Sequence, residues 1–295
     1  MKILITGSNG QVGFELARTL LPLGEVFALN REKADLTNLE KLRSTIQQIQ
    51  PDVIVNAAAY TAVDKAESER NTAFLINEKV VAVLAQEAKK LNALLIHYST
   101  DYVFDGTKDV PYNEDDVTNP LNVYGESKLA GEQAIQQSSA DYLILRTTWI
   151  FASRGQNFVK SILRLAAERE ELNIVADQIG APTSARFIAE TTAHILRQTQ
   201  QERGAKIFKS GIYNLTNSGE TSWHGFAEKI VELARRKNIE LKNRVIHPIP
   251  TTAYPTPAKR PLNSRLSTQK LTQHFGLMMS SWETVLEHCL VEMNG

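Results

Sequence analysis

The chain of 295 residues contains 42% hydrophobic and 22% charged residues, a balance that excludes a disordered or low-complexity protein. Its 33 basic and 33 acidic residues give a formal net charge of zero, which argues against binding of nucleic acid or of an anionic membrane through an overall positive field. No apolar run has the length of a membrane-spanning helix and the first residues lack the features of a signal peptide, so we expect a soluble cytoplasmic protein.

In the first half of the chain, short apolar runs alternate with amphipathic stretches. The runs predict strands at Lys2–Thr6, Glu25–Leu29, Asp52–Asn56, Ala93–Ser99 and Tyr142–Thr147, and the stretches predict helices at Gln11–Leu21, Leu39–Ile49, Asn71–Leu91 and Asn122–Gln137. Strands that alternate with helices pair in parallel, and continuous apolar runs are typical of strands buried on both faces. We therefore expect an α/β fold with a Rossmann-type doubly wound parallel sheet in residues 1–150.

After Ile150 the alternation is less regular. Helices are predicted at Phe158–Glu168, Ala185–Gln198, Trp223–Lys237 and Ser281–Met293, separated by connections rich in Gly, Pro and Asn. Three prolines between Thr251 and Pro261 predict an extended loop. We expect residues 151–295 to form a smaller region that mainly binds substrate, with later segments that could return to the first region.

A glycine-rich turn follows the first predicted strand and opens the first predicted helix. Gly7, Gly10 and Gly13 form the pattern G-x-x-G-x-x-G. Glycines at this spacing allow a tight turn and bring backbone N–H groups close to a pyrophosphate at a helix N-terminus. A plain strand–helix turn needs only one glycine, so the pattern predicts a dinucleotide site.

The end of the second predicted strand bears on which dinucleotide binds. An acidic residue there would repel a 2′-phosphate, but the chain has Asn30 and Arg31. This pair favours NADPH and leaves NADH acceptable, although Arg31 could equally be a solvated surface charge. Asp35 and Leu36 follow and could cover the adenine, or Asp35 could serve as a helix N-cap with its neighbours.

Tyr124 and Lys128 form the pattern Y-x-x-x-K at the start of a predicted helix. Their spacing places the phenol and the ammonium on one face, where the ammonium would lower the pKa of the tyrosine. Thr100, at the end of the fourth predicted strand, is our candidate for a hydroxyl that binds a substrate carbonyl, with Ser99 as the rival. His97 is interpreted as a buried polar group and not as an acid–base catalyst.

Several longer segments narrow the interpretation: NAAAYTAVDKAE from Asn56, STDYVFDG from Ser99, YGESKLAGE from Tyr124, RTTWIF from Arg146, NF at Asn157, DQIGAPT from Asp177 and PTPAKRPLNSRL from Pro255. Together with the glycine turn they resemble the dTDP-4-dehydrorhamnose reductases, a family of the extended short-chain dehydrogenase/reductase superfamily. The resemblance runs nearly from end to end. Tyr60 departs slightly from the family, in which some members carry His.

The resemblance implies a reductase that uses NADPH to reduce the 4-keto group of dTDP-4-dehydro-L-rhamnose, the last step of dTDP-L-rhamnose synthesis. Tyr124 would donate the proton, Lys128 would hold Tyr124 and the ribose, and Thr100 would orient the carbonyl. The product would serve lipopolysaccharide or another cell-wall polysaccharide. The expected cofactor contacts are Gly7, Gly10, Gln11, Val12, Gly13, Asn30, Arg31, Asp35, Leu36, Ala59, Tyr60, Thr61, Tyr98, Tyr124 and Lys128.

The resemblance also implies that Thr100, Asp101 and Trp149 meet the dTDP-sugar, although Trp149 could be a core aromatic. Polar residues of the second half are further candidates for the substrate: Asn157, Gln178, Thr183 and Arg260. Arg260 and its neighbour Lys259 lie in the proline-rich loop and could bind pyrophosphate. A solvated basic pair would have the same sequence.

Some members of this family are described as homodimers bridged by magnesium through glutamates. The corresponding residues are Glu15, Glu190 and Glu292, each in a predicted helix, and ordinary solvated helix charges would look the same. The single cysteine, Cys289, permits no internal disulfide or cysteine metal cage, and we interpret it as a small apolar group. We expect a homodimer and treat Mg²⁺ as an open expectation.

Two other functions stay open. A nucleotide-sugar epimerase or dehydratase with bound NAD would need a further acid–base group near the sugar, for which Asp101 is available. A non-catalytic regulatory protein on the same fold would have no chemical need for Tyr124, Lys128 and Thr100, whose presence argues against it.

Overall fold

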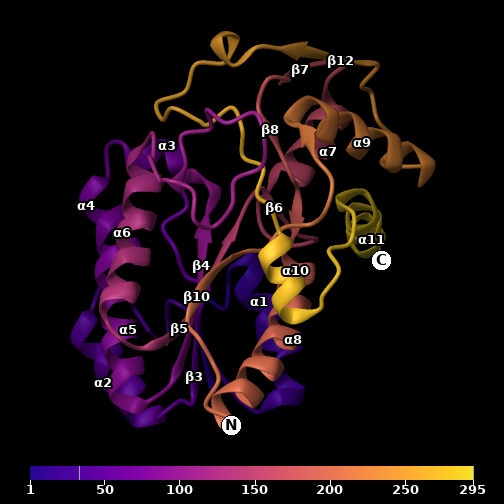
Figure 1. Cartoon of the computed structure of the whole chain (residues 1–295). Coiled ribbons are helices and arrows are strands. Elements are labelled where there is room, and N and C mark those ends of the chain that lie inside the picture. The colour runs from indigo at the N-terminus through magenta and orange to yellow at the C-terminus, as the bar shows by residue number, and fades with distance from the viewer. Residues whose placement is uncertain (33, 295) are drawn as a thin grey trace.

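A six-stranded parallel sheet organises the computed structural model, which describes residues 1–32 and 34–294 (Figure 1). The strands run in the order β10-β5-β4-β3-β1-β2. Their bounds are β1 Lys2–Thr6, β2 Glu25–Leu29, β3 Val53–Asn56, β4 Leu94–Thr100, β5 Asp141–Thr147 and β10 Gly211–Asn214. The strand order reverses between β1 and β3, and ligands bind outside the carboxyl ends of the strands at such a reversal. The predicted doubly wound sheet is confirmed.

Helices cover both faces of this sheet, as Figure 1 shows. One face carries α2 (Leu39–Ile49), α5 (Val80–Leu91) and α6 (Val123–Gln137), and the other carries α1 (Gln11–Thr19) and α8 (Ala185–Gly204). Successive strand residues point to opposite faces of the sheet. Leu4 therefore packs against the face covered by α2, α5 and α6, while Ile3 and Ile5 pack against the face covered by α1 and α8. Burial on both faces explains why these strands read as continuous apolar runs.

The helix predicted at Asn71–Leu91 differs from the observed structure. It consists of α4 (Arg70–Phe74), a π-helical turn (Leu75–Lys79) and α5. Asn77 in this turn is fully buried and hydrogen-bonds the backbone of Tyr60 and the Ser127 hydroxyl. The widened turn therefore places a polar side chain between the α6 helix and the wall of the cavity described below, as π-bulges often do near functional sites.

Residues of the second half build a smaller core. Its helices are α7 (Phe158–Glu168), α9 (Trp223–Arg236) and α11 (Trp282–Asn294), which pack around Phe226 and Leu286 beside the paired strands β7 (Glu171–Val175) and β12 (Val245–Ile249). The remaining elements are short: η1 Leu21–Leu23, α3 Val63–Ala66, η3 Asp101–Val103, β6 Ile150–Phe151, β8 Ile179–Gly180, β9 Thr183–Ser184, β11 Thr221–Ser222, η4 Thr251–Ala253 and α10 Gln269–Phe275.

Two segments of the second half join the first region. Strand β10 pairs with β5 at the edge of the main sheet, and α8 packs on the same face as α1. In Figure 1 their orange ribbons lie among the purple elements of the first half. Within the described residues, no helix is both long and apolar enough to cross a bilayer.

Candidate active site

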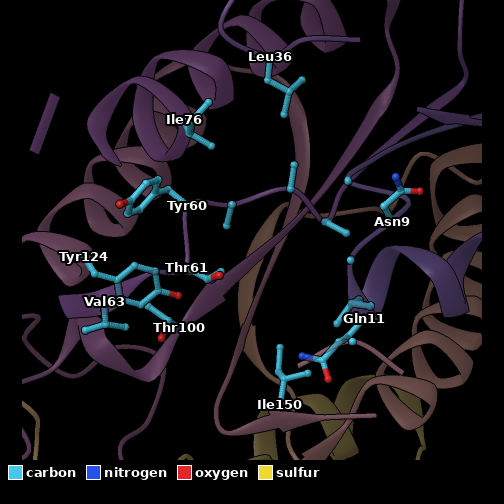
Figure 2. A pocket seen from close by; sticks show the side chains of 18 of the residues that line it. Asn9, Gln11, Leu36, Tyr60, Thr61, Val63, Ile76, Thr100, Tyr124 and Ile150 are labelled. Carbon is cyan, nitrogen blue, oxygen red and sulfur yellow. The ribbon is translucent and has the colours of Figure 1, made fainter. Parts of the chain in front are cut away.

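A cavity of about 1010 Å³ lies at the carboxyl ends of the strands. Figure 2 shows Asn9 and Gln11 on one side of it, with Thr100 and Tyr124 on the opposite side. The lining combines the glycine turn, the end of β2, the segment after β3, the end of β4 and the start of α6. Segments far apart in the sequence meet here because parallel strands end at one edge of the sheet.

The glycine turn fits tightly against its surroundings. Gly7 has a φ of +72°, and a Cβ there would lie 2.7 Å from the Ala58 nitrogen. A Cβ on Gly13 would lie 2.1 Å from the Gly7 carbonyl oxygen, so only glycine lets α1 begin this close to the turn. Gly7, Gly10, Gln11 and Val12 line the cavity, whereas Gly13 supports the turn from behind.

The end of β2 lines the same cavity with Asn30, Arg31, Asp35 and Leu36. The Asp35 carboxylate accepts hydrogen bonds from the backbone N–H (3.0 Å) and hydroxyl (2.8 Å) of Thr37. These two bonds hold the pKa of Asp35 below its usual value. The N-cap of α2 is Asn38, which accepts from the Lys41 nitrogen at 3.0 Å, so Asp35 orders the preceding turn instead.

Ala59, Tyr60 and Thr61 form the wall after β3. The Tyr60 backbone is clamped by Asn77, whose Oδ1 accepts from Tyr60 N at 2.9 Å and whose Nδ2 donates to Tyr60 O at 3.1 Å. The Tyr60 hydroxyl donates to Glu69 at 2.8 Å, on the outer part of the wall.

Tyr124, Thr100 and Asp101 line the cavity together, with Thr100 next to Tyr124 in Figure 2. The Thr100 hydroxyl donates to Asp101 Oδ1 at 3.0 Å. Asp101 is 3% exposed, and its Oδ2 has no hydrogen-bond partner within the described part of the chain. Burial raises the pKa of Asp101 to about 6. Ser99 also lines the cavity, but the position of Thr100 next to Tyr124 favours Thr100 as the catalytic hydroxyl.

Lys128 is fully buried and does not line the cavity. Its Nζ donates to the Tyr98 carbonyl at 2.7 Å and lies 3.2 Å from His97 Nε2. Burial lowers the pKa of Lys128 to about 8, while burial also raises the pKa of Tyr124. The sequence led us to expect a lowered tyrosine pKa. Desolvation opposes the phenolate here, which keeps the proton on the group expected to donate it.

A buried ion pair fixes the helix that carries Tyr124 and Lys128. Arg146 on β5 donates from Nε (2.9 Å) and Nη2 (2.7 Å) to the two carboxylate oxygens of Glu132 on α6. At the start of the helix, the Asn122 side chain accepts from the Gly125 nitrogen at 2.8 Å. Removing one partner of a buried pair costs about 3–5 kcal/mol, so the pair constrains the position of α6 strongly.

Two indole rings wall the cavity on the side of the second half. Trp149 stacks on Trp223 with ring centroids 3.6 Å apart. Trp149 has a φ of +47°, a conformation that bulky residues adopt rarely and mostly at functional sites. Thr183 contributes to holding it, because its backbone nitrogen donates to the Trp149 carbonyl at 3.2 Å.

Four residues expected at the substrate serve as connections around the cavity. Asn157 caps α7 and donates to Gln11 at 2.9 Å, and Gln178 accepts from the Trp223 indole N–H at 3.2 Å. The Thr183 hydroxyl donates to the Ala181 carbonyl at 3.0 Å, and Arg260 donates to Asp64 at 2.8 Å. They hold the lining without being part of it.

Of the expected cofactor contacts, Tyr98 points away from the cavity: its hydroxyl lies 2.7 Å from that of Thr192 on α8. The cavity is also lined by Trp223, Tyr102 and Gln156, which we did not expect there from the sequence. Tyr102 lies within the quoted STDYVFDG segment, so its strand-end position was a usable signal. Trp223 only marked a helix start, and nothing in its spacing pointed to the site.

The three glutamates considered for a metal do converge, but on an arginine. Glu15 on α1, Glu190 on α8 and Glu292 on α11 line a second cavity of about 510 Å³. Arg186 donates to Glu15 at 3.2 Å and also pairs with Glu292. Burial opposes the charge of Arg186, but these carboxylates outweigh it and raise the arginine pKa. Within residues 1–32 and 34–294 of the single chain, no group of three or more His, Cys, Asp or Glu is arranged to hold a metal ion.

Comparisons with known proteins agree over nearly the whole length. A family model described as "RmlD substrate binding domain" matches residues 1–294. The chain is 52% identical to a dTDP-4-dehydrorhamnose reductase of Burkholderia thailandensis, covering 99% of each chain. It is 48% identical to that of Escherichia coli K12, covering 99% of this chain and 98% of the relative.

Solved structures give the same result. A dTDP-4-dehydrorhamnose reductase of Clostridium acetobutylicum superposes with a TM-score of 0.90 at 34% identity, over 100% of both chains. That of Bacillus anthracis, solved in complex with NADP, has a TM-score of 0.88 at 35% identity over 99% of both chains. A UDP-glucose 4-epimerase of Thermus thermophilus, at 19% identity and a TM-score of 0.81 over 100% of this chain and 99% of its own, shares the fold.

Proposed function

The chain belongs to the dTDP-4-dehydrorhamnose reductase family, and we propose that it reduces the 4-keto group of dTDP-4-dehydro-L-rhamnose with NADPH to give dTDP-L-rhamnose, the last step of dTDP-rhamnose synthesis. The observation that carries the proposal is one cavity with a glycine turn on one side and Tyr124 and Thr100 next to each other on the opposite side. This arrangement brings a dinucleotide and a carbonyl group together.

The residues of the cavity fit NADPH. Backbone of the glycine turn lies open to a pyrophosphate at the N-terminus of α1, where any side chain on Gly7 would collide with Ala58. Asn30 and Arg31 line the adenosine end and place no carboxylate beside a 2′-phosphate. NADH lacks only that phosphate, so we propose that it is accepted with lower preference.

When bound, NADPH supplies a hydride to C4 of the sugar. Tyr124 then gives its hydroxyl proton to the carbonyl oxygen, so that the ketone becomes an alcohol and the tyrosine a phenolate. Thr100 hydrogen-bonds the same oxygen and fixes the carbonyl against Tyr124. The charge of Lys128 would stabilise the phenolate until Tyr124 regains a proton, and the family resemblance assigns Lys128 a contact with the nicotinamide ribose.

The second half holds the dTDP-sugar. We assign the sugar to the space between Asp101 and Trp149, next to Thr100. Asn157, Gln178, Thr183 and Arg260 position this half of the cavity through the hydrogen bonds described above. A division into residues 1–150 for the dinucleotide and 151–295 mainly for the sugar nucleotide belongs to the same proposal, apart from β10 and α8.

One observation favours a second candidate. Asp101 has a buried, unpartnered carboxylate oxygen among the described residues and a raised pKa, as an acid–base group of an epimerase or dehydratase would require. Incubation with dTDP-4-dehydrorhamnose and NADPH, followed by identification of the sugar, separates the candidates. A reductase consumes one NADPH per dTDP-rhamnose formed, an epimerase or dehydratase shows no net consumption, and a regulatory protein gives no product.

We also propose a homodimer and a cytoplasmic location, which sedimentation and cell fractionation test. Glu15 and Glu292 pair with Arg186 within one chain, a contact that does not involve a second subunit. Magnesium would in any case lie outside the cavity in which reduction takes place.

A further inference from the structure

A row of buried polar side chains crosses the main sheet at one level. Thr6 on β1 is the register partner of Asn56 on β3, which in turn is the partner of His97 on β4. Register partners on neighbouring parallel strands point to the same face. All three residues are at most 1% exposed. Such a row in an apolar sheet is costly unless its hydrogen bonds are satisfied.

The row is hydrogen-bonded throughout and ends at Lys128. The Thr6 hydroxyl donates to Asn56 Oδ1 at 2.6 Å, and Asn56 Nδ2 lies 2.9 Å from His97 Nδ1. On the other side of the ring, His97 Nε2 lies 3.2 Å from Lys128 Nζ. The Tyr98 carbonyl accepts a second hydrogen bond from the same Nζ at 2.7 Å.

The backbone N–H of Ala58 determines which way the Asn56 side-chain amide is turned, and with it the direction of these hydrogen bonds. The backbone N–H of Ala58 can only donate, and it donates to Asn56 Oδ1 at 3.3 Å. Asn56 therefore turns its Nδ2 toward His97, whose Nδ1 accepts, and a neutral imidazole then carries its proton on Nε2. An N–H on Nε2 can donate to a neutral Lys128 amine but faces an ammonium unfavourably.

We propose that His97 is a positioning residue for Lys128: it fixes Lys128 Nζ on the helix that also carries Tyr124, and its tautomer is linked to whether Lys128 carries its proton. Only the expected effect of His97 substitutions on turnover rests on the proposed reductase activity. An ammonium on Lys128 requires a lone pair on Nε2, hence a proton on Nδ1 and an inverted Asn56 amide. A neutral amine has a lone pair and can also accept from an N–H on Nε2, so deprotonation of Lys128 permits the orientation in which Asn56 Nδ2 faces His97.

The surroundings agree with this linkage. Burial, followed by the charge of Lys128, keeps the pKa of His97 well below its usual value, so the ring stays neutral and can change only its tautomer. Among the groups that face Lys128, Glu132 on α6 raises its pKa, but Glu132 is already paired with Arg146 on β5. Tyr98 and Tyr124 stay protonated because burial raises their pKa values.

The direct test is NMR of the whole protein labelled with ¹⁵N-histidine. His97→Gln identifies the His97 signals. From about pH 6 to about pH 10 we expect a neutral His97 whose two ring nitrogens exchange protonated and unprotonated shifts in one step. Lys128→Met should abolish the step. A wild-type ring with constant shifts, or a step that persists in Lys128→Met, would overturn the linkage.

Turnover provides a second test with a matched pair of variants. In His97→Asn the amide replaces Nδ1 and keeps Asn56 satisfied but cannot reach Lys128, whereas in His97→Gln the amide reaches Lys128. We expect His97→Asn to lose about tenfold to a hundredfold in kcat, and His97→Gln to remain within about threefold. Equal rates in the two variants would show that His97 only fills space.

The two tests separate this inference from the proposed function. If the wild type does not reduce dTDP-4-dehydrorhamnose, the reductase proposal fails while the NMR step still decides the linkage. If His97→Asn does not fold, the histidine shifts and the rate of His97→Gln decide it, since a rate loss beyond tenfold in the glutamine variant counts against the positioning role.

Discussion

Trp149 stacks face to face on Trp223, with ring planes 14° apart. The opposite face of the Trp149 ring rests on Gly180. A Cβ on that glycine would lie 2.7 Å from Trp149 Cε2, so no side chain fits between the backbone and the ring. The Trp149 ring is therefore held between the Gly180 backbone and the Trp223 indole, and its edge faces the cavity. This packing on both faces explains how Trp149 keeps a backbone conformation that bulky residues avoid.

The first prediction concerns the contact between Gly180 and the Trp149 ring. Gly180→Ala places a methyl group against the Trp149 ring, so the ring must move, at a stability cost of about 1–3 kcal/mol. We expect KM for the sugar nucleotide to rise about tenfold or more while the Kd of NADPH stays the same. Gly204→Ala is the matched control, because among the described residues no atom outside its own helix backbone and chain neighbours would lie within 4 Å of its Cβ. An unchanged KM in Gly180→Ala would show that Trp149 does not contact the sugar.

The second prediction concerns the proton donor. Tyr124→Phe removes the hydroxyl and keeps the ring, including its edge contact with Tyr102 at 5.5 Å. Acid–base groups contribute about 10²–10⁴-fold, and we expect a loss of that size in kcat. Fluorescence titration should show nearly unchanged NADPH affinity. Tyr142→Phe, outside the cavity, serves as the control, and wild-type turnover of Tyr124→Phe would disprove the assignment.

The third prediction concerns cofactor choice. Asn30→Asp places a carboxylate at the adenosine end, where it would repel a 2′-phosphate and hydrogen-bond a ribose hydroxyl. The ratio of kcat/KM for NADH to that for NADPH should therefore rise. Asn173→Asp on the exposed side of β7 makes the same charge change elsewhere and should leave the ratio constant. A ratio that falls in Asn30→Asp would place Asn30 away from the ribose.

Most elements of the first half could be predicted because each obeys a local rule. The strands are apolar on both faces, the helices have one apolar side, and three glycines mark the turn between β1 and α1. The π-helical turn could not be predicted, since it depends on Asn77 meeting Tyr60 and Ser127, which lie far away in the sequence. The same is true of β10, whose place in the sheet depends on a partner strand.

The catalytic end of the site was predictable and the substrate end was not. Tyr124 and Lys128 are four residues apart on one helix, so spacing alone relates them. Trp223 and Gly180 reach Trp149 only through the packing of the second half, which has no regular alternation of strands and helices. The sequence also showed three glutamates but not that Arg186 would lie among them.

The fourth prediction follows from burial of Asp101. The folded-state pKa of about 6 exceeds the usual aspartate value of 3.8, so the charged carboxylate destabilises the fold at neutral pH and the protonated group does not. Asp101→Asn should gain up to about 3 kcal/mol in free energy of unfolding at pH 7 and above. The gain should shrink as pH falls through the folded pKa and vanish below the unfolded value.

Chemical denaturation as a function of pH measures this difference. Asp109→Asn removes a carboxylate from the surface and should show no such pH-dependent gain. A constant difference between wild type and Asp101→Asn from about pH 4 to about pH 8 would mean that Asp101 is not desolvated.

The fifth prediction concerns Arg186 and magnesium. Three carboxylates in one cavity repel one another, and in this chain a guanidinium supplies the opposing charge that a divalent cation would otherwise supply. Sedimentation and melting temperature of the wild type and of Glu190→Gln should therefore be the same in magnesium and in EDTA. Arg186→Met removes the guanidinium and leaves the buried Glu15 without its partner, so this variant should melt earlier and should be stabilised by magnesium. Arg164→Met, which breaks an exposed pair with Glu168, controls for loss of a cation and should respond to neither reagent. A wild-type dimer that dissociates in EDTA would instead show that a metal bridges the glutamates.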